Sequence, residues 1–165
     1  MDIVNEDLES ADMIFGQIDS PRGHWGVAFA GILNGYIKRY PTYFEIRNFF
    51  EIDLDFLIKN NKMLYIENAL KSVDVLAEFN QEIYKYVARV MFENKYYQTS
   101  KDYLEKAADT FYRDPELHFL FAKYYKQFSQ YEKALFYLQE CLNYIPDYYP
   151  AIQLRQELES LLKKN

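Results

Sequence analysis

The sequence predicts an all-α fold in which antiparallel helix pairs follow one another along the chain. In residues 115–145, apolar side chains recur at the spacing of one helix face on both sides of a short polar break. Helix start and stop signals divide the chain into segments of helix length. Residues 81–114 repeat the arrangement of residues 115–148 at an offset of 34 positions. We therefore expect one domain over residues 1–165, built as a stack of helix pairs.

Residues 1–20 predict an acidic N-terminal helix or arm. They contain no Lys or Arg, and their acidic residues are Asp2, Glu6, Asp7, Glu9, Asp12 and Asp19. Removing these six from the 25 acidic residues of the chain leaves 19, which equals the 19 Lys and Arg. A solvated face is the plain interpretation, and docking on basic residues of a partner or of this chain is the alternative. The balanced remainder lacks the basic surface that nucleic acid requires.

Residues 21–79 predict divergent helix pairs. The glycines of the first helix match neither a phosphate-binding loop nor a dinucleotide fingerprint, so Gly31 and Gly35 are interpreted as a flat packing face. That face also suits self-association with a second copy. His24 and Trp25, near the helix start, carry the alternative function, an accessory domain of an enzyme with a small-molecule pocket; no nucleophile or orienting partner accompanies them.

A helix over residues 42–59 is predicted from the capping box of Thr42 and Glu45, and its apolar circumference suggests a central position. A turn at 60–62 and a helix over 63–77 follow.

The best-defined pair lies in residues 115–148. Asp114 before Pro115 is typical of a helix start, and Pro146 ends the second helix. Ser129 and Glu132 predict a capping box between the two helices. In residues 81–114 the second helix is expected to run on to Arg113, since no proline stops it. Residues 149–163 predict a capping helix with a polar outer face.

The spacing of large and small residues resembles the tetratricopeptide repeat, a family of helix–turn–helix units of about 34 residues. One unit carries the pattern at Phe121, Ala122, Tyr125, Tyr131, Ala134, Leu138, Cys141 and Pro146. The preceding unit carries it at Tyr84, Val87, Ala88, Met91, Tyr97, Ser100, Leu104 and Ala107. The resemblance covers residues 81–163 and implies a right-handed solenoid whose first helices line a concave groove.

The resemblance also implies a peptide-binding groove on the first helix of each unit. Its residues would be Glu82, Lys85, Arg89, Phe92, Glu116, Phe119, Lys123 and Lys126. Four cations and two Phe rings against two Glu suit an acidic or C-terminal peptide with an apolar anchor, although alternating charge also keeps a surface hydrated. Family members that clamp a terminal carboxylate have Asn where this chain has Arg89, which counts against such a clamp.

We therefore expect a non-enzymatic, cytoplasmic protein–protein interaction scaffold without cofactor or metal. The single cysteine, Cys141, permits no internal disulfide and is expected to be an inert core thiol. No secretory signal opens the chain, and its longest apolar run, 25–33, is too short to span a bilayer. Membrane association through residues 25–37 ranks last among the functions considered, because that helix has few cations.

Overall fold

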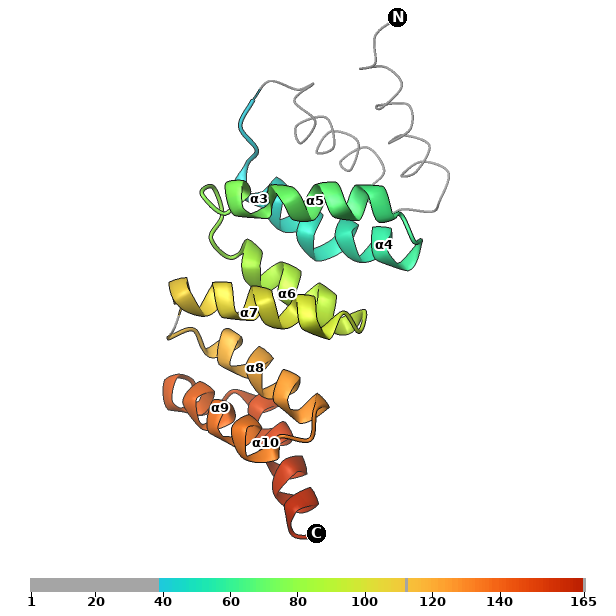
Figure 1. The fold of residues 1–165 in the computed structure, drawn as a ribbon. Coiled ribbons are helices and arrows are strands. Elements are labelled where there is room, and N and C mark those ends of the chain that lie inside the picture. The colour runs from blue at the N-terminus through green and yellow to red at the C-terminus, as the bar shows by residue number, and fades with distance from the viewer. Residues whose placement is uncertain (1–38, 112, 165) are drawn as a thin grey trace, which may run out of the picture. The chain divides into compact units, whose positions relative to one another are not determined.

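The computed structural model describes residues 39–111 and 113–164, and every element in these two ranges is a helix (Figure 1). The elements are α3 (Tyr43–Asn48), the π-helix η1 (Phe49–Asp53), α4 (Leu54–Lys59), α5 (Met63–Leu76), α6 (Ile83–Glu93), α7 (Tyr97–Phe111), α8 (Pro115–Gln127), α9 (Tyr131–Tyr144) and α10 (Tyr149–Leu162). The all-α prediction is confirmed for these residues. The expectations for the acidic N-terminal helix, for Gly31 and Gly35, and for His24 and Trp25 lie outside them.

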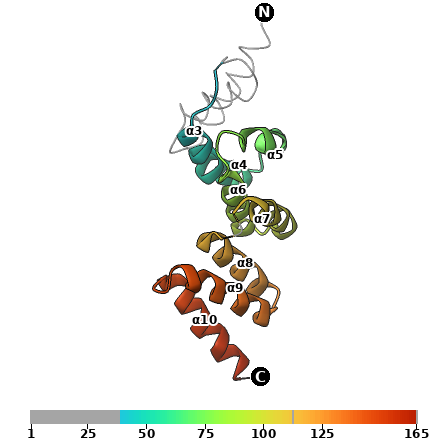
Figure 2. The ribbon, with the colours of Figure 1, turned by 90° about the vertical axis from the view of Figure 1, so that its left-hand side faces the viewer.

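The chain divides between Val90 and Met91 into two compact units. Unit 1 denotes the described residues 39–90, and unit 2 denotes the described residues from 91 to 164. In unit 1, α4 packs against α5. In unit 2, α7 packs against α8, α8 against α9, and α9 against α10. Figures 1 and 2 both show α8, α9 and α10 side by side.

The start of unit 1 follows the predicted capping box. The Glu45 N–H donates to Thr42 Oγ1 at 3.2 Å, and the Thr42 N–H donates to Glu45 Oε2 at 2.9 Å. The predicted single helix over 42–59 is interrupted, however, by the π-helix η1 in its middle. A π turn adds a residue to the turn and shifts the face that follows. Asp53, the last residue of η1, is buried at 1% exposure.

Unit 2 has a core in which small residues let helices approach closely. Ala122 on α8 and Ala134 on α9 are both fully buried, as the repeat spacing predicts. The same cluster contains Leu138, Cys141, Leu142, Ala151, Leu154 and Leu158. The last three belong to α10, whose opposite side carries exposed polar residues.

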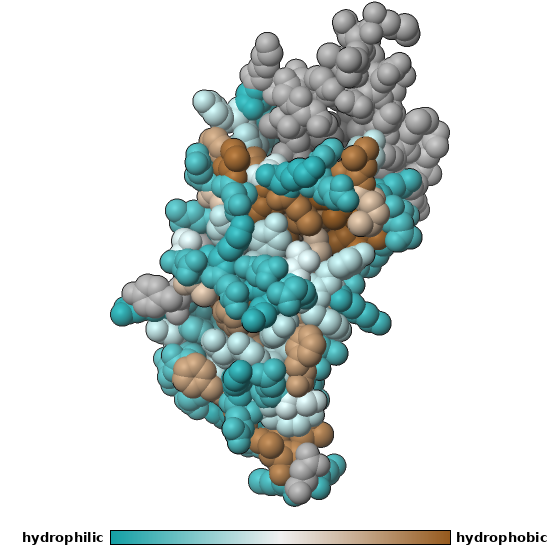
Figure 3. All heavy atoms as spheres, in the orientation of Figure 1, coloured by the Kyte–Doolittle hydropathy of each residue, from teal (hydrophilic) through white to brown (hydrophobic). Residues whose placement is uncertain are grey.

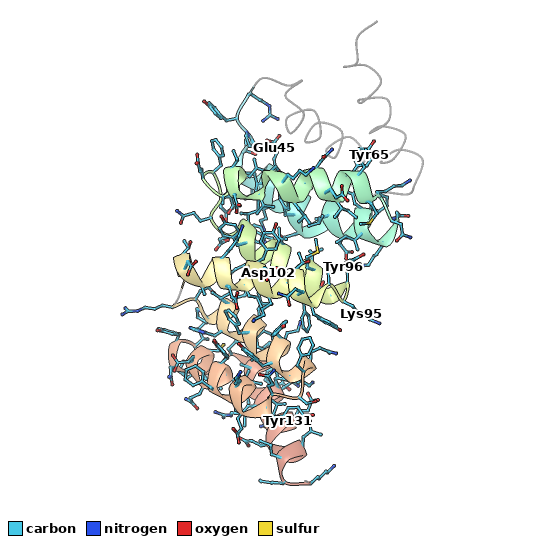
Figure 4. The ribbon with its side chains drawn as sticks, viewed as in Figure 1. Glu45, Tyr65, Lys95, Tyr96, Asp102 and Tyr131 are labelled. Atoms are coloured by element: carbon cyan, nitrogen blue, oxygen red, sulfur yellow. The ribbon has the colours of Figure 1, made fainter. Side chains whose placement is uncertain are left out.

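Three interhelical turns share one geometry and recur every 34 positions. Asn61, Lys95 and Ser129 each have a positive φ, at 55°, 67° and 55°. In each turn this residue donates its N–H to the carbonyl three positions back. The next residue donates five positions back, as in Tyr96 to Met91 at 2.9 Å. These two bonds define a Schellman motif. Figure 4 labels Lys95 and Tyr96 in the turn that leads into α7, and Tyr131 where α9 begins after the Ser129 turn.

Two predicted helix ends are wrong, for identifiable reasons. The capping box of Ser129 and Glu132 does not form, because Ser129 takes the left-handed conformation that closes the preceding helix; Gln130 precedes α9 without a side-chain cap. The helix α7 ends at Phe111 rather than at Arg113. Its continuation is blocked because Asp114, extended before a proline, caps α8 by accepting from the Leu117 N–H at 3.0 Å.

The exposed apolar side chains of unit 1 include Met63, Leu64 and Val75 on α5. On the face drawn in Figure 3, hydrophobic atoms gather over this part of unit 1, and hydrophilic atoms cover most of α7 in unit 2.

Candidate functional site

Unit 2 contains a groove with a volume of about 670 Å³. The helix α8 forms its middle, and residues from the end of α6 and from α10 form its sides. The lining residues are Phe92, Phe119, Lys123, Lys126, Gln127, Pro150, Gln153, Leu154 and Glu157. A volume of this size is within the range of clefts that bind small molecules or side chains of a partner.

The floor of the groove is apolar and held in place by ring contacts. Leu154 is 9% exposed and belongs to the core of unit 2. The half-buried Phe119 meets Tyr148 edge to face, with ring centroids 5.5 Å apart. Phe92 meets Tyr97 in the same way at 5.4 Å. Such pairs favour defined ring orientations, so the floor is preformed rather than adaptable.

The two lysines of the groove differ in their electrostatic surroundings. The Lys126 ammonium lies 2.8 Å from Glu157 Oε1, so an ion pair joins α8 to α10. The Lys123 ammonium lies 5.3 Å from the ring centroid of Phe92, in a cation–π arrangement. Among the residues that the structure describes, Lys123 forms no ion pair. Its positive charge is therefore uncompensated by a carboxylate within the groove.

Two amides complete the rim. Gln153 donates from Nε2 to the Tyr149 hydroxyl at 2.9 Å, which leaves its carbonyl oxygen as an acceptor. Gln127, at the end of α8, is exposed. Such groups can satisfy the backbone N–H and C=O groups of an incoming segment.

Four of the eight predicted groove residues line this groove: Phe92, Phe119, Lys123 and Lys126. Glu116, on the same helix α8, is half-buried and is not one of the lining residues. The remaining three belong to unit 1, where the structure engages each of them in local contacts.

In unit 1, Glu82 accepts hydrogen bonds from the hydroxyls of Tyr43 and Tyr86, each at 2.8 Å. Burial opposes the ionised carboxylate, but the bonds from Tyr86 and Tyr43 and the nearby Lys85 lower the pKa of Glu82 overall. Burial and the bonds to Tyr43 and Glu82 raise the pKa of Tyr86. Glu82, Tyr43 and Tyr86 therefore form a hydrogen-bond network within unit 1.

Lys85 and Arg89 are also engaged within unit 1. Lys85 is only 3% exposed, with its ammonium 3.5 Å from Glu82 Oε1, so the prediction of an accessible groove cation is wrong for this residue. The register of α6 turns its side chain into the unit. The Arg89 guanidinium forms an ion pair with Glu51 at 2.5 Å. Each of these two cations has a carboxylate partner within unit 1, whereas Lys123 forms no ion pair among the described residues.

Sequence reasoning missed the contribution of α10, which supplies Pro150, Gln153, Leu154 and Glu157. Residues 149–163 were expected only to cover the end of the stack. A signal was nevertheless present, because the 34-residue offset takes Glu116 to Pro150, Phe119 to Gln153 and Lys123 to Glu157. Applying the repeat spacing once more would have placed these three on the groove side of α10.

Other candidate chemistry in the described residues is limited. Burial and then the negative charge of Asp114 raise the pKa of the Cys141 thiol to about 11, so the thiolate is scarce near neutral pH. No group of His, Cys, Asp and Glu side chains in residues 39–111 and 113–164 could hold a metal ion. None of the described helices has the length and apolar character needed to cross a bilayer.

Comparison of the chain with protein-family models and with curated proteins finds no match.

Proposed function

We propose that this protein is a non-enzymatic scaffold that holds a segment of another protein in the groove of unit 2. The observation that carries the proposal is the combination of an ordered apolar floor with the uncompensated charge of Lys123. An apolar floor supplies affinity through burial, and a few placed polar groups supply orientation. Preformed rings reduce the entropy lost on binding.

We further propose that the chain is a solenoid of helix pairs similar to the tetratricopeptide repeat. The turns at Asn61, Lys95 and Ser129 support this, since one Schellman geometry recurs at the repeat length of that family. Fully buried Ala88, Ala122 and Ala134 support it as well. By the same spacing, the divergent residues before 81 include a unit with its turn at Asn61.

The chemistry of the lining residues favours binding over catalysis. They offer two ammonium groups, two amides, one carboxylate and apolar surface, and the carboxylate is already paired with Lys126. A nucleophile held by a general base, which acyl transfer requires, is not present among them.

A display selection of random 12-residue peptides tests the proposal. The selection is run with the full chain, with Gln153→Trp and with Gln156→Trp. Both glutamines are exposed on α10, but only Gln153 lines the groove. The indole of Gln153→Trp fills the groove without entering the core, and Gln156→Trp adds the same bulk elsewhere on the helix.

We expect peptides enriched on the wild-type chain to bind Gln156→Trp equally and Gln153→Trp at least about tenfold more weakly, as for loss of a central interface contact. Equal binding to all three proteins would place the peptides outside the groove and overturn the assignment. Failure to enrich any peptide would overturn the proposed function itself.

A further inference from the structure

We infer that Lys123, and not Lys126, recognises a side-chain carboxylate of the bound segment, next to an apolar side chain that sits on Phe119 and Leu154. The inference rests on the proposed function and specifies the chemistry of its partner. The occupant is an acidic segment with an aliphatic or aromatic anchor close to its carboxylate.

The ion pair of Lys126 is the first step in the argument. Its ammonium lies 2.8 and 2.9 Å from the two Glu157 oxygens, so an incoming carboxylate would have to compete with one already in place. Both members of this pair are partly exposed. Opposite charges at this distance cancel each other's field beyond a few ångströms, particularly at physiological salt. Lys126 therefore lines the groove without adding a net charge to it.

Lys123 is placed differently. The Phe92 ring, 5.3 Å from the ammonium, attracts the cation without neutralising it and holds the flexible side chain at the groove. An ammonium has three donors, and a ring face occupies at most one of them. The remaining donors suit a carboxylate, which forms the stronger, charge-assisted hydrogen bonds.

The position of Lys123 also fixes where the carboxylate must lie in the segment. Lys123 follows Phe119 by one helical turn on α8, so the cation and the apolar floor are neighbours on one face. Carboxylate and anchor in the partner must then be close as well. That spacing corresponds to two positions in an extended segment or three to four in a helical one.

Charge complementarity selects an acidic occupant over a basic or neutral one. The groove contains two Lys and one Glu, which gives a net formal charge of +1. In unit 1 the cations Lys85 and Arg89 are paired with Glu82 and Glu51, so they offer no equivalent uncompensated charge.

The test uses the consensus peptide from the display selection and its analogues in which each Glu or Asp is replaced in turn by Gln or Asn. Calorimetric titration compares these peptides on four full-length proteins: wild type, Lys123→Gln, the double variant Lys126→Gln/Glu157→Gln, and Lys133→Gln. The double variant removes the ion pair without changing net charge. Lys133 is the matched control, because its ammonium also lies over a ring, 5.2 Å from Tyr125, but outside the groove.

On the wild type, one carboxylate-to-amide change is expected to weaken binding about five- to tenfold, as for a charge-assisted hydrogen bond. On Lys123→Gln the acid and its amide analogue should bind within about twofold of each other, whereas the other two variants should keep the wild-type discrimination. Thermal unfolding of each variant checks that the fold is intact.

The inference would be overturned if Lys123→Gln still bound the acidic peptide more tightly than its amide analogue. It would also be overturned if the Lys126→Gln/Glu157→Gln double variant lost this difference in affinity. A selected consensus without acidic residues would overturn it as well. In these cases peptides still bind in a manner sensitive to Gln153→Trp, so the proposed function stands and only the assigned chemistry fails.

Discussion

Lys126 on α8 and Glu157 on α10 both line the groove and form an ion pair, with the ammonium 2.8 Å from Glu157 Oε1. The pair neutralises one of the two groove lysines. Removing the Glu157 carboxylate should therefore leave the positive charge of Lys126 uncompensated.

We therefore predict that Glu157→Gln raises affinity for the selected acidic peptide about two- to fivefold, the effect of one partly exposed charge. The gain should shrink with added salt because the charges are partly exposed. Fluorescence polarisation at two salt concentrations measures it. Glu159→Gln is the control, since Glu159 lies on the same helix, paired with Arg155 and outside the groove. An equal gain in the control would indicate a general charge effect.

Glycine substitutions at the three turn residues with positive φ should stabilise the protein to different extents. A non-glycine residue in this conformation is disfavoured by contact between its Cβ and the backbone, and Asn tolerates it best. Lys95→Gly and Ser129→Gly should each raise the free energy of unfolding by about 0.5 to 1 kcal/mol, and Asn61→Gly by less. Urea denaturation measures the change. Destabilisation by Lys95→Gly and Ser129→Gly would contradict the turn geometry.

The fully buried alanines of unit 2 should not accept larger side chains. Ala122→Leu and Ala134→Leu should each lower the free energy of unfolding by about 1 to 3 kcal/mol, because the added atoms separate closely packed helices. Gln139→Leu, which adds a similar side chain to an exposed position of α9, is the control. Denaturation midpoints equal to that of the control would show that α8 and α9 are not in close contact.

The start of α3 should lose stability in acid. The hydrogen bond from Arg39 is the largest of the effects that lower the pKa of Glu45, and bonds from Thr42 lower it further. Burial acts in the opposite direction, and the net result is a pKa of about 2 instead of 4.5. A carboxyl whose pKa is lowered by folding stabilises the folded state above its unfolded pKa, and this contribution is lost as the pH falls from about 4.5 to 2.

Glu45→Gln should remove that part of the acid sensitivity. Thermal unfolding of both proteins between pH 6 and pH 2 should show a difference in melting temperature that is largest at pH 6 and smallest at pH 2. A difference independent of pH would indicate that the Glu45 carboxylate does not contribute through its charge.

Much of the fold was predictable because local signals were unambiguous. The capping box of Thr42, the Asp114–Pro115 helix start and the buried Ala122 and Ala134 all follow from residue type and spacing. The π-helix at 49–53 was not predictable, since apolar residues around the whole circumference do not fix a register. The sequence pattern at Ser129 indicated a capping box, but closure of the preceding helix prevailed over capping of the next.

The candidate site was predictable only in part. Repeat spacing identified Phe119 and Lys123, but spacing does not say whether a neighbouring acid neutralises a cation. The ion pair of Lys126 with Glu157 depends on α10 lying beside α8, and the burial of Lys85 depends on contacts within unit 1. These are tertiary relationships, so they became visible only in the structure.

Amide and side-chain NMR titration of the full chain with the selected peptide tests the central claim most directly. We predict that the largest chemical-shift changes fall on groove residues of α8 and α10, including Phe119, Lys123 and Gln153. Changes concentrated instead on the exposed side of α9, around Phe136 and Gln139, with the groove signals unmoved, would contradict the account.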